Sequence, residues 1–183
     1  MPLATLGSLV TVPALERTDL LAPPVVALLG RWPEAFSVGV TQIDPDVSDT
    51  AVFTATYDVP PEASANCVVV AGRREGEERV AACVVLATTR ADVNGAVRRL
   101  LDVRKTSFLA MDAAVERTGM EYGGITPVGL PTGWRILVDA RVADVPLAVV
   151  GSGLRRSKLL LPGAAIAALP GAEVVEGLAN PVG

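Results

Sequence analysis

Residues 119–131 read GMEYGGITPVGLP, and with Thr132 and Gly133 they hold five glycines and two prolines in fifteen residues. Glycine serves where the backbone needs a positive φ or where another group comes very close to it. Proline fixes φ and removes a backbone donor. The stretch therefore predicts a stiffened loop that offers a ligand backbone N–H and C=O groups in place of reactive side chains.

The side chain most often used for proton transfer is missing, because none of the 183 residues is histidine. This excludes a Ser-His-Asp or Cys-His hydrolase and a His-ligated zinc site. Proton transfer must use carboxylates, Lys, Tyr, Cys, water or the substrate. Cys67 and Cys83 lie in apolar, β-like runs and are interpreted as buried free thiols. A disulfide would require neighbouring strands and an oxidising compartment.

Composition predicts one domain with a core of mostly Val, Leu and Ala, since half the residues are hydrophobic and only 4% are aromatic. No apolar run reaches the roughly 18 uncharged residues of a membrane span. The N-terminal stretch lacks the basic region of a signal peptide. We expect a soluble cytoplasmic protein with no membrane contact.

Hydrophobic spacing predicts helices near residues 24–31, 49–57, 92–101, 111–118 and 163–169, and strands near 36–43, 67–71, 79–87, 134–139, 147–150 and 158–161. The charged stretch 72–78 indicates a hairpin with a solvated tip. Without regular βαβ repeats, this order favours an α+β fold: a single domain whose mixed, mainly antiparallel, curved sheet is flanked by helices. Residues 1–45 are expected to form an extension packed on a domain of residues 46–183.

Charge is distributed unevenly along the chain. Residues 1–62 carry two basic and eight acidic side chains, whereas residues 63–158 carry fourteen basic and ten acidic ones. The basic positions form two clusters: Arg98, Arg99, Arg104 and Lys105, then Arg155, Arg156 and Lys158. Such clusters suit a polyanion such as the end of an RNA, and a solvated helix face is the alternative for the first cluster. The second cluster directly follows Gly151-Ser152-Gly153, a candidate anion-binding turn.

The run from Cys83 to Gly129, which contains TG and GGITPVG, resembles the YbaK/EbsC-type aminoacyl-tRNA deacylase domain. This domain also occurs as the editing insertion of bacterial prolyl-tRNA synthetases. The similarity continues through ILVDARV (136–142) and VVGSGLRRSKLLLPG (149–163), and it covers roughly residues 50–178. The combination of these motifs is specific, and it implies a YbaK-like fold.

The resemblance implies hydrolysis of the ester that links a wrong amino acid to the 3′-terminal adenosine of a tRNA. The mechanism attributed to the family uses ordered water and the terminal ribose hydroxyl, with no metal or cofactor. The implied catalytic positions are Gly123 and Asp139, although an Asp that ends a strand also suits a turn. The implied substrate-binding positions are Asn66, Gly124, Ile125, Thr126, Pro127, Gly129, Gly151, Ser152 and Gly153. The tRNA contacts are expected from Arg104, Lys105, Arg155, Arg156 and Lys158.

One departure from the family pattern affects function. Members of this family with deacylase activity carry a lysine at the start of the strand that here reads ANCVVV, and this position falls on Ala65 or Asn66. The only lysines of the chain are Lys105 and Lys158. Either the basic clusters replace the missing cation, or the ligand differs, or catalysis has been lost.

Two hypotheses follow from these residues. The first is a free-standing, trans-acting deacylase of the prolyl-tRNA editing type, whose expected partners are the aminoacyl-tRNA acceptor end and prolyl-tRNA synthetase. The second is a non-catalytic binding module of the same fold for an aminoacyl-tRNA end, a nucleotide or a small ligand.

Overall fold

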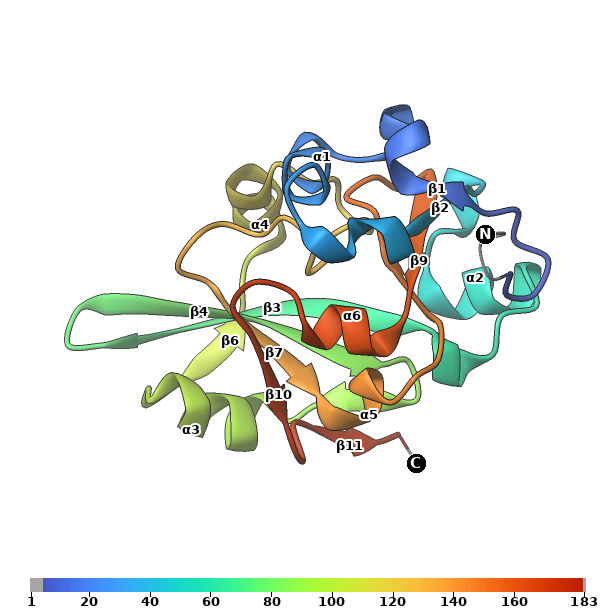
Figure 1. Cartoon of the computed structure of the whole chain (residues 1–183). Helices are drawn as coiled ribbons and strands as arrows, with labels where there is room; N and C mark the ends of the chain where they lie inside the picture. The colour runs from blue at the N-terminus through green and yellow to red at the C-terminus, as the bar shows by residue number, and fades with distance from the viewer. Residues whose placement is uncertain (1–4, 183) are drawn as a thin grey trace.

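Two curved sheets form the body of the molecule in the computed structural model, which describes residues 5–182 (Figure 1). The first sheet is antiparallel throughout and has the strand order β1 (Val12–Pro13), β2 (Gly39–Gln42), β9 (Ser157–Leu161), β8 (Ala148–Gly151). The second has the order β10 (Ala172–Val175), β7 (Arg135–Asp139), β4 (Glu77–Leu86), β3 (Ala65–Arg74), β6 (Thr106–Phe108).

The second sheet is mixed. Strands β10, β7 and β4 run parallel, whereas β3 pairs antiparallel with both β4 and β6. A parallel bridge between Ser64 and Val149 connects the two sheets where β3 begins. A third, two-stranded sheet pairs β5 (Thr89–Ala91) with β11 (Ala179–Pro181). This arrangement confirms the predicted α+β fold and its mixed, mainly antiparallel strand pairing, but the strands divide among three sheets in place of the single sheet that was expected.

Short helices flank the sheets. The α-helices are α1 (Pro23–Leu29), α2 (Thr50–Thr56), α3 (Arg98–Leu101), α4 (Met111–Thr118), α5 (Ala140–Ala143) and α6 (Gly163–Ala167). Single 3₁₀ turns span Ala14–Glu16 (η1), Thr18–Leu20 (η2), Pro33–Ser37 (η3), Pro45–Val47 (η4) and Pro61–Ala63 (η5), and a π-helical turn, η6 (Val93–Val97), leads into α3. Gly119 ends α4 in the left-handed conformation, as glycine commonly does at the end of a helix.

Strands β3 and β4 form the predicted hairpin, which projects as a long arm in Figure 1. The strands continue farther than the sequence analysis predicted, and only Glu75 and Gly76 remain for the turn. The charged residues are compatible with a strand because Arg73 lies opposite Glu78 and Arg74 lies opposite Glu77. Opposite charges placed across a strand pair stabilise it.

Three hydrophobic clusters hold the layers together. The largest lies between the sheets and is covered by α1 and α6; it includes Val84, Val138 and Leu159. A second lies on the other face of the mixed sheet, against α3. The third packs α2 on the outer face of the antiparallel sheet through Phe53 and Leu160. Since strand side chains alternate between faces, Leu159 and Leu160 belong to different clusters.

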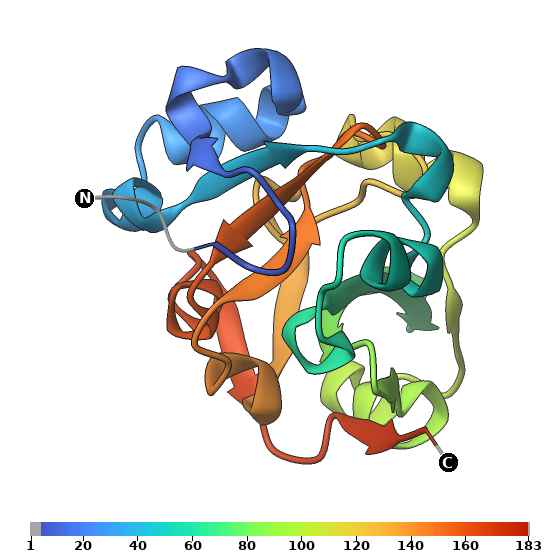
Figure 2. The ribbon, with the colours of Figure 1, turned by 90° about the vertical axis from the view of Figure 1, so that its right-hand side faces the viewer.

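The N-terminal segment is more integrated than the expected extension. Strand β2 pairs directly with β9, and Leu9, Ala14 and Leu20 are buried. Figure 2 shows this segment, in blue, lying along one end of the molecule beside β9. The strand predicted from residue 36 begins only at Gly39, because Pro33–Ser37 form a 3₁₀ turn.

Cys67 and Cys83 are free, as predicted. They lie on adjacent strands, but Cys67 faces Val84 and Cys83 faces Val68 in the register, so their side chains point to opposite faces of the sheet. Among the described residues, no helix is long and apolar enough to span a bilayer.

Candidate functional site

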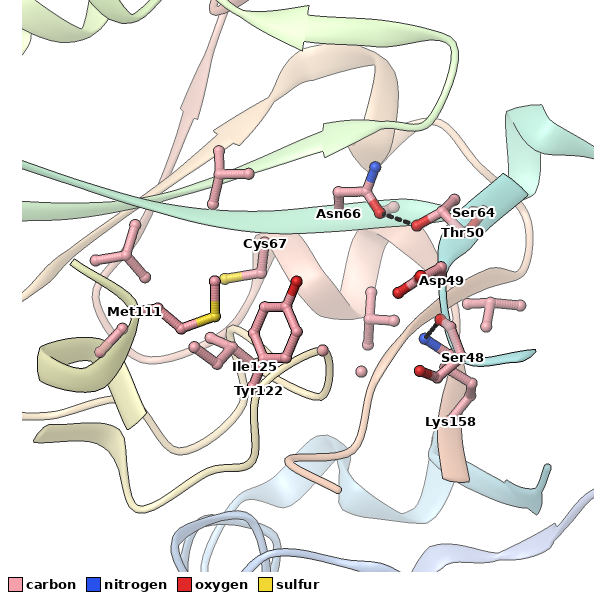
Figure 3. A pocket seen from close by; sticks show the side chains of 18 of the residues that line it. Ser48, Asp49, Thr50, Ser64, Asn66, Cys67, Met111, Tyr122, Ile125 and Lys158 are labelled. Atoms are coloured by element: carbon pink, nitrogen blue, oxygen red, sulfur yellow. Dashed lines mark hydrogen bonds between the residues drawn. The ribbon is translucent and has the colours of Figure 1, made fainter. Parts of the chain in front are cut away.

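A cavity of about 440 Å³ opens beside the start of β3 (Figure 3). Its walls come from the segment before α2, from β3, from the start of α4, from the glycine-rich loop after α4, and from β8 and β9. The lining residues include Ser48, Asp49, Thr50, Asn66, Cys67, Leu109, Met111, Tyr122, Gly123, Ile125, Gly151 and Lys158. The cavity therefore collects segments from most of the chain.

The two ends of this cavity differ in chemistry, as Figure 3 shows. Ser48, Asp49, Thr50, Asn66 and Lys158 form a polar end, whereas Cys67, Met111 and Ile125 form an apolar end. Two aromatic side chains at the rim are largely exposed: Phe108 by 64% and Tyr122 by 54%. A ligand with one polar and one apolar part fits such a cavity, and exposed aromatic faces suit stacking on a nucleobase.

At the polar end, Asn66 is held in place by the helix start across the cavity. Thr50 Oγ1 donates a hydrogen bond to Asn66 Oδ1 at 2.7 Å, which fixes the orientation of the Asn66 amide group. Asp49 is the residue that precedes α2, a position where an Asp side chain commonly caps the helix. Its side chain makes no capping hydrogen bond. Its carboxylate thus lines the cavity and is not used by the helix.

Lys158 enters the cavity wall from β9. Period-two alternation places its side chain on the α2 side of the strand, together with Leu160. Its Nζ donates to the Ser48 carbonyl oxygen at 3.1 Å and lies 5.2 Å from the centre of the Phe53 ring. Burial, and to a lesser degree the positive charge of Arg155, lower the pKa of Lys158 to about 8, while Asp49 acts in the opposite direction.

The glycine-rich loop reaches the cavity through Gly123 and Ile125. Gly123 has a φ of +77°, a conformation that L-residues adopt only with strain. Gly124 donates to the Glu121 carbonyl oxygen at 2.9 Å and accepts from the Gly153 N–H at 2.7 Å. Within residues 5–182, the N–H groups of Gly123 and Ile125 donate to no backbone carbonyl. These two N–H groups are therefore candidates for a contact with a ligand.

Arg155 ties this loop to the segment before α2. Its backbone N–H donates to Glu121 Oε2 at 2.7 Å, and its guanidinium carbon lies 5.7 Å from the centre of the Tyr122 ring. Its Nη2 also donates to the Pro45 carbonyl oxygen at 3.2 Å. The guanidinium thus bridges two walls of the cavity beside Gly123.

The structure brings some of the predicted site residues together and separates others. Asn66, Gly123, Ile125, Gly151 and Lys158 line the cavity. Gly124 and Gly153 lie behind it, where they pair with each other through their backbones.

Three other residues of the predicted substrate-binding set are turned away from the cavity. Thr126 is fully buried, with its hydroxyl directed at the Val128 N–H. Pro127 and Gly129 line a different cavity of about 400 Å³ against α1.

Ser152 is buried as well, although the sequence made it look like an exposed hydroxyl between two glycines. Its Oγ lies 2.7 Å from Ser157 Oγ and contacts the carbonyl oxygens of Leu154 and Ser157. This network occupies the hydroxyl, so Ser152 fixes the turn before β9 and does not face a ligand.

Asp139 likewise does not line the cavity, contrary to its predicted catalytic role. Its carboxylate accepts hydrogen bonds from the Arg141 side chain at 2.7 and 2.9 Å and from the Ala179 N–H at 3.0 Å. Burial raises the pKa of Asp139, but these hydrogen bonds and the Arg141 charge outweigh burial and lower it. Asp139 therefore fastens the C-terminal strand to α5.

The basic clusters have different environments. Arg104 and Lys105 are exposed before β6, and Arg156 is exposed on the turn before β9. Arg156 Nη2 donates to the Asp19 carbonyl oxygen at 2.7 Å. Lys158, predicted to belong to the same surface cluster, is 9% exposed and lies in the cavity wall.

Sequence reasoning missed Ser48, Asp49 and Thr50 as cavity residues because a helix cap explained the same pattern. It also missed the apolar wall formed by Cys67 and Met111. Burial raises the pKa of Cys67, and it raises that of Cys83 to about 12, so both thiols are neutral near pH 7. Cys67 is thus an apolar wall residue and not a thiolate nucleophile.

Comparison with known proteins agrees with this architecture. A family model described as "Aminoacyl-tRNA editing domain" matches residues 44–169. No curated protein matches the sequence significantly.

Among solved structures, a candidate trans-editing enzyme for prolyl-tRNA synthetase is 20% identical, with a TM-score of 0.70 over 85% of this chain and 97% of that one. The hypothetical protein APE2540 is 19% identical, with a TM-score of 0.70 over 80% and 94% of the two chains. Both similarities show a shared fold.

Proposed function

The chain belongs to the aminoacyl-tRNA editing domain family, and from that premise we propose that it is a trans-acting aminoacyl-tRNA deacylase of the prolyl-tRNA editing type. Its substrate would be a tRNA that carries the wrong amino acid on its 3′-terminal ribose. The solved structure described as a candidate trans-editing enzyme for prolyl-tRNA synthetase supports the same type of activity, although it establishes only the fold.

The observation that carries the proposal is the position of the glycine-rich loop. Gly123 and Ile125 form one wall of a cavity with a polar and an apolar end, and their N–H groups have no backbone acceptor in the described part of the chain. An aminoacyl ribose has a matching division between a polar sugar and an amino-acid side chain. Backbone donors aimed at the ester carbonyl would stabilise the negative charge that develops on its oxygen.

The proposed reaction is an ester hydrolysis. Water attacks the carbonyl carbon, the bond between this carbon and the ribose oxygen breaks, and the departing ribose oxygen takes up a proton. The neighbouring ribose hydroxyl positions the water, so the protein need not supply a histidine. The protein's own contribution is to orient the ester against the loop and to hold the acyl side chain at the apolar end.

A deacylation assay tests this proposal directly. The purified protein is incubated with tRNAs charged with Ala, Ser, Thr or Cys, and the loss of the amino acid is followed over time. At least one mischarged tRNA should lose its amino acid faster than in buffer. Equal rates with and without protein for all four would refute the proposal.

One observation favours the second hypothesis, a binding module without activity. The ionisable side chains that line the cavity are Asp49, Cys67, Tyr122 and Lys158, and the Cys67 thiol is neutral. Position 65 or 66, where the family carries a lysine, is uncharged. Separate Ala65→Lys and Asn66→Lys variants distinguish the hypotheses. A large gain in deacylation would mean that the natural chain had lost its anchor.

A further inference from the structure

Lys158 is a buried cation without a carboxylate partner. Its side chain is 9% exposed, and none of the ion pairs within residues 5–182 includes it. An ammonium group has three N–H donors. One of them donates to the Ser48 carbonyl oxygen, so two have no protein acceptor in the described part of the chain. A buried charge in this state requires another partner.

Packing alone does not explain a lysine at this position. The strand alternation places Lys158 on the same face as Leu160, which packs against Phe53 of α2. An apolar side chain would complete that face without the desolvation of a charge. The lysine, however, lines the cavity, so a bound ligand can reach it.

A second group beside Lys158 also lacks a partner. The hydroxyl of Ser48 is buried and has no hydrogen-bond partner within residues 5–182. The same residue gives its carbonyl oxygen to Lys158, so the hydroxyl and the ammonium are close neighbours in one wall. Buried polar groups in proteins are nearly always hydrogen-bonded. Two unsatisfied donors side by side therefore indicate a place for a ligand oxygen.

The charges around Lys158 favour an anionic ligand. Asp49 and Arg155 are the charged groups that influence the ammonium, and they act on it in opposite directions. Asp49 comes from the residue before α2 and lies beyond ion-pair distance, whereas Arg155 comes from the turn before β9. With Lys158 itself, this corner of the cavity carries one net positive charge.

We propose that Lys158 and Ser48 form a subsite that binds an anionic oxygen of the ligand. A phosphate of the terminal nucleotide and the carboxylate of the released amino acid share this chemistry. The choice of these two ligands rests on the proposed function, whereas the subsite itself requires no hydrolysis. Lys158 of β9 thus supplies a cation to the cavity, whereas the lining residues of β3 carry no charge.

The test compares two pairs of probes by isothermal titration calorimetry. Adenosine 5′-monophosphate is compared with adenosine, and L-alanine is compared with L-alaninamide. In at least one pair the member that carries the phosphate or carboxylate group should bind about tenfold tighter or more, the range expected for a hydrogen bond to a charged group. The pair that shows the preference identifies the source of the anion. No preference in either pair would overturn the proposal.

Variants connect the preference to the subsite. Lys158→Met should abolish it and Ser48→Ala should reduce it, whereas Arg90→Met, which removes an exposed cation on β5, should leave it unchanged. A preference that survives in Lys158→Met would overturn the proposal. The deacylation assay is independent: hydrolysis without an anion preference refutes the subsite alone, and a preference without hydrolysis refutes the proposed activity alone.

The wild-type protein offers a test that needs no variant. The Lys158 ammonium loses its proton as pH rises through about 8, so the anion preference should fall between pH 7 and pH 9.5. A phosphate monoester has its second pKa near 6 and stays doubly charged over this interval. A preference that does not change across it would contradict the role of Lys158.

Discussion

Replacing Lys158 by Met should stabilise the protein at neutral pH. Burial lowers the pKa of Lys158 from 10.5 to about 8. Each pKa unit corresponds to about 1.4 kcal/mol, so the charged lysine destabilises the folded state by about 3 kcal/mol at pH 7. Methionine has a similar length and no charge, and it keeps the contact with Phe53. We therefore expect the free energy of unfolding of Lys158→Met to exceed that of the wild type by up to about 3 kcal/mol.

The effect has a sign and a pH window. The folded-state pKa of Lys158 lies below the unfolded value, so between about pH 8 and 10.5 the unfolded chain binds more protons than the folded one. Wild-type stability should therefore rise with pH across this interval. The advantage of the variant should shrink accordingly, by about 2–3 kcal/mol between pH 7 and pH 10.

Urea unfolding of both proteins at a series of pH values measures this difference. Lys105→Met removes an exposed lysine and serves as the control, with an expected change of less than about 0.5 kcal/mol at every pH. If Lys158→Met is less stable than the wild type at pH 7, and the difference is the same at pH 10, then burial of the Lys158 ammonium does not destabilise the folded protein. The argument for a ligand-directed role would lose its basis.

Three further predictions concern the loop, Asp139 and the exposed cations. A Cβ on Gly123 would lie 2.5 Å from Arg155 Nη1, whereas a Cβ on Gly133 would meet nothing within 4 Å. Gly123→Ala and Gly133→Ala should each lower the free energy of unfolding by about 1–2 kcal/mol. Only Gly123→Ala should also slow deacylation, by about tenfold or more. Asp139→Asn should destabilise the protein by about 2–3 kcal/mol at pH 7 while the turnover of the folded fraction stays unchanged. Because the folded-state pKa of Asp139 is lowered, the stability lost in Asp139→Asn should diminish as pH falls below about 4. A lower turnover of the folded variant would instead make Asp139 a catalytic candidate again. A double Arg104→Ala, Lys105→Ala variant should reduce the number of counterions released on tRNA binding by about one to two. This number is measured as the slope of the logarithm of the binding constant against the logarithm of the salt concentration, and an unchanged slope would mean that the acceptor end binds elsewhere.

The sequence predicted the fold well where its signals were local. The hairpin of β3 and β4 and the helix α4 with its Gly119 cap appear where hydrophobic spacing placed them. The short strands β1, β5, β6, β10 and β11 were missed, because their two to four residues show neither a continuous apolar run nor a clear period of two. They exist because neighbouring strands or loops supply their hydrogen bonds, and this depends on tertiary structure.

The site was predicted only in part, and the reason is visible in Ser152 and Lys158. Both residues lie in the stretch GSGLRRSK, where glycines and basic residues indicated an exposed anion-binding turn. The strand register instead turns Lys158 toward α2, and the Ser152 hydroxyl is hydrogen-bonded to the buried Ser157 hydroxyl. Which of several polar residues is exposed depends on the partners that the fold brings to them, and local sequence does not carry that information.

The position of the cation is the main difference between the expected site and the observed one. In the family pattern a lysine begins the strand that corresponds to β3, where this chain has Ala65 and Asn66. Here the ammonium of Lys158 enters the same cavity from β9, in the other sheet. A cation that binds an anionic oxygen needs to lie within hydrogen-bonding distance of it, but the strand that carries it is not constrained. If Lys158 binds the ligand as proposed, adding a lysine at position 66 would place two ammonium groups in one cavity and weaken both through repulsion. Any gain of deacylation in Asn66→Lys should then be larger when Lys158 is replaced by Met as well, and comparing the single and double variants measures this dependence.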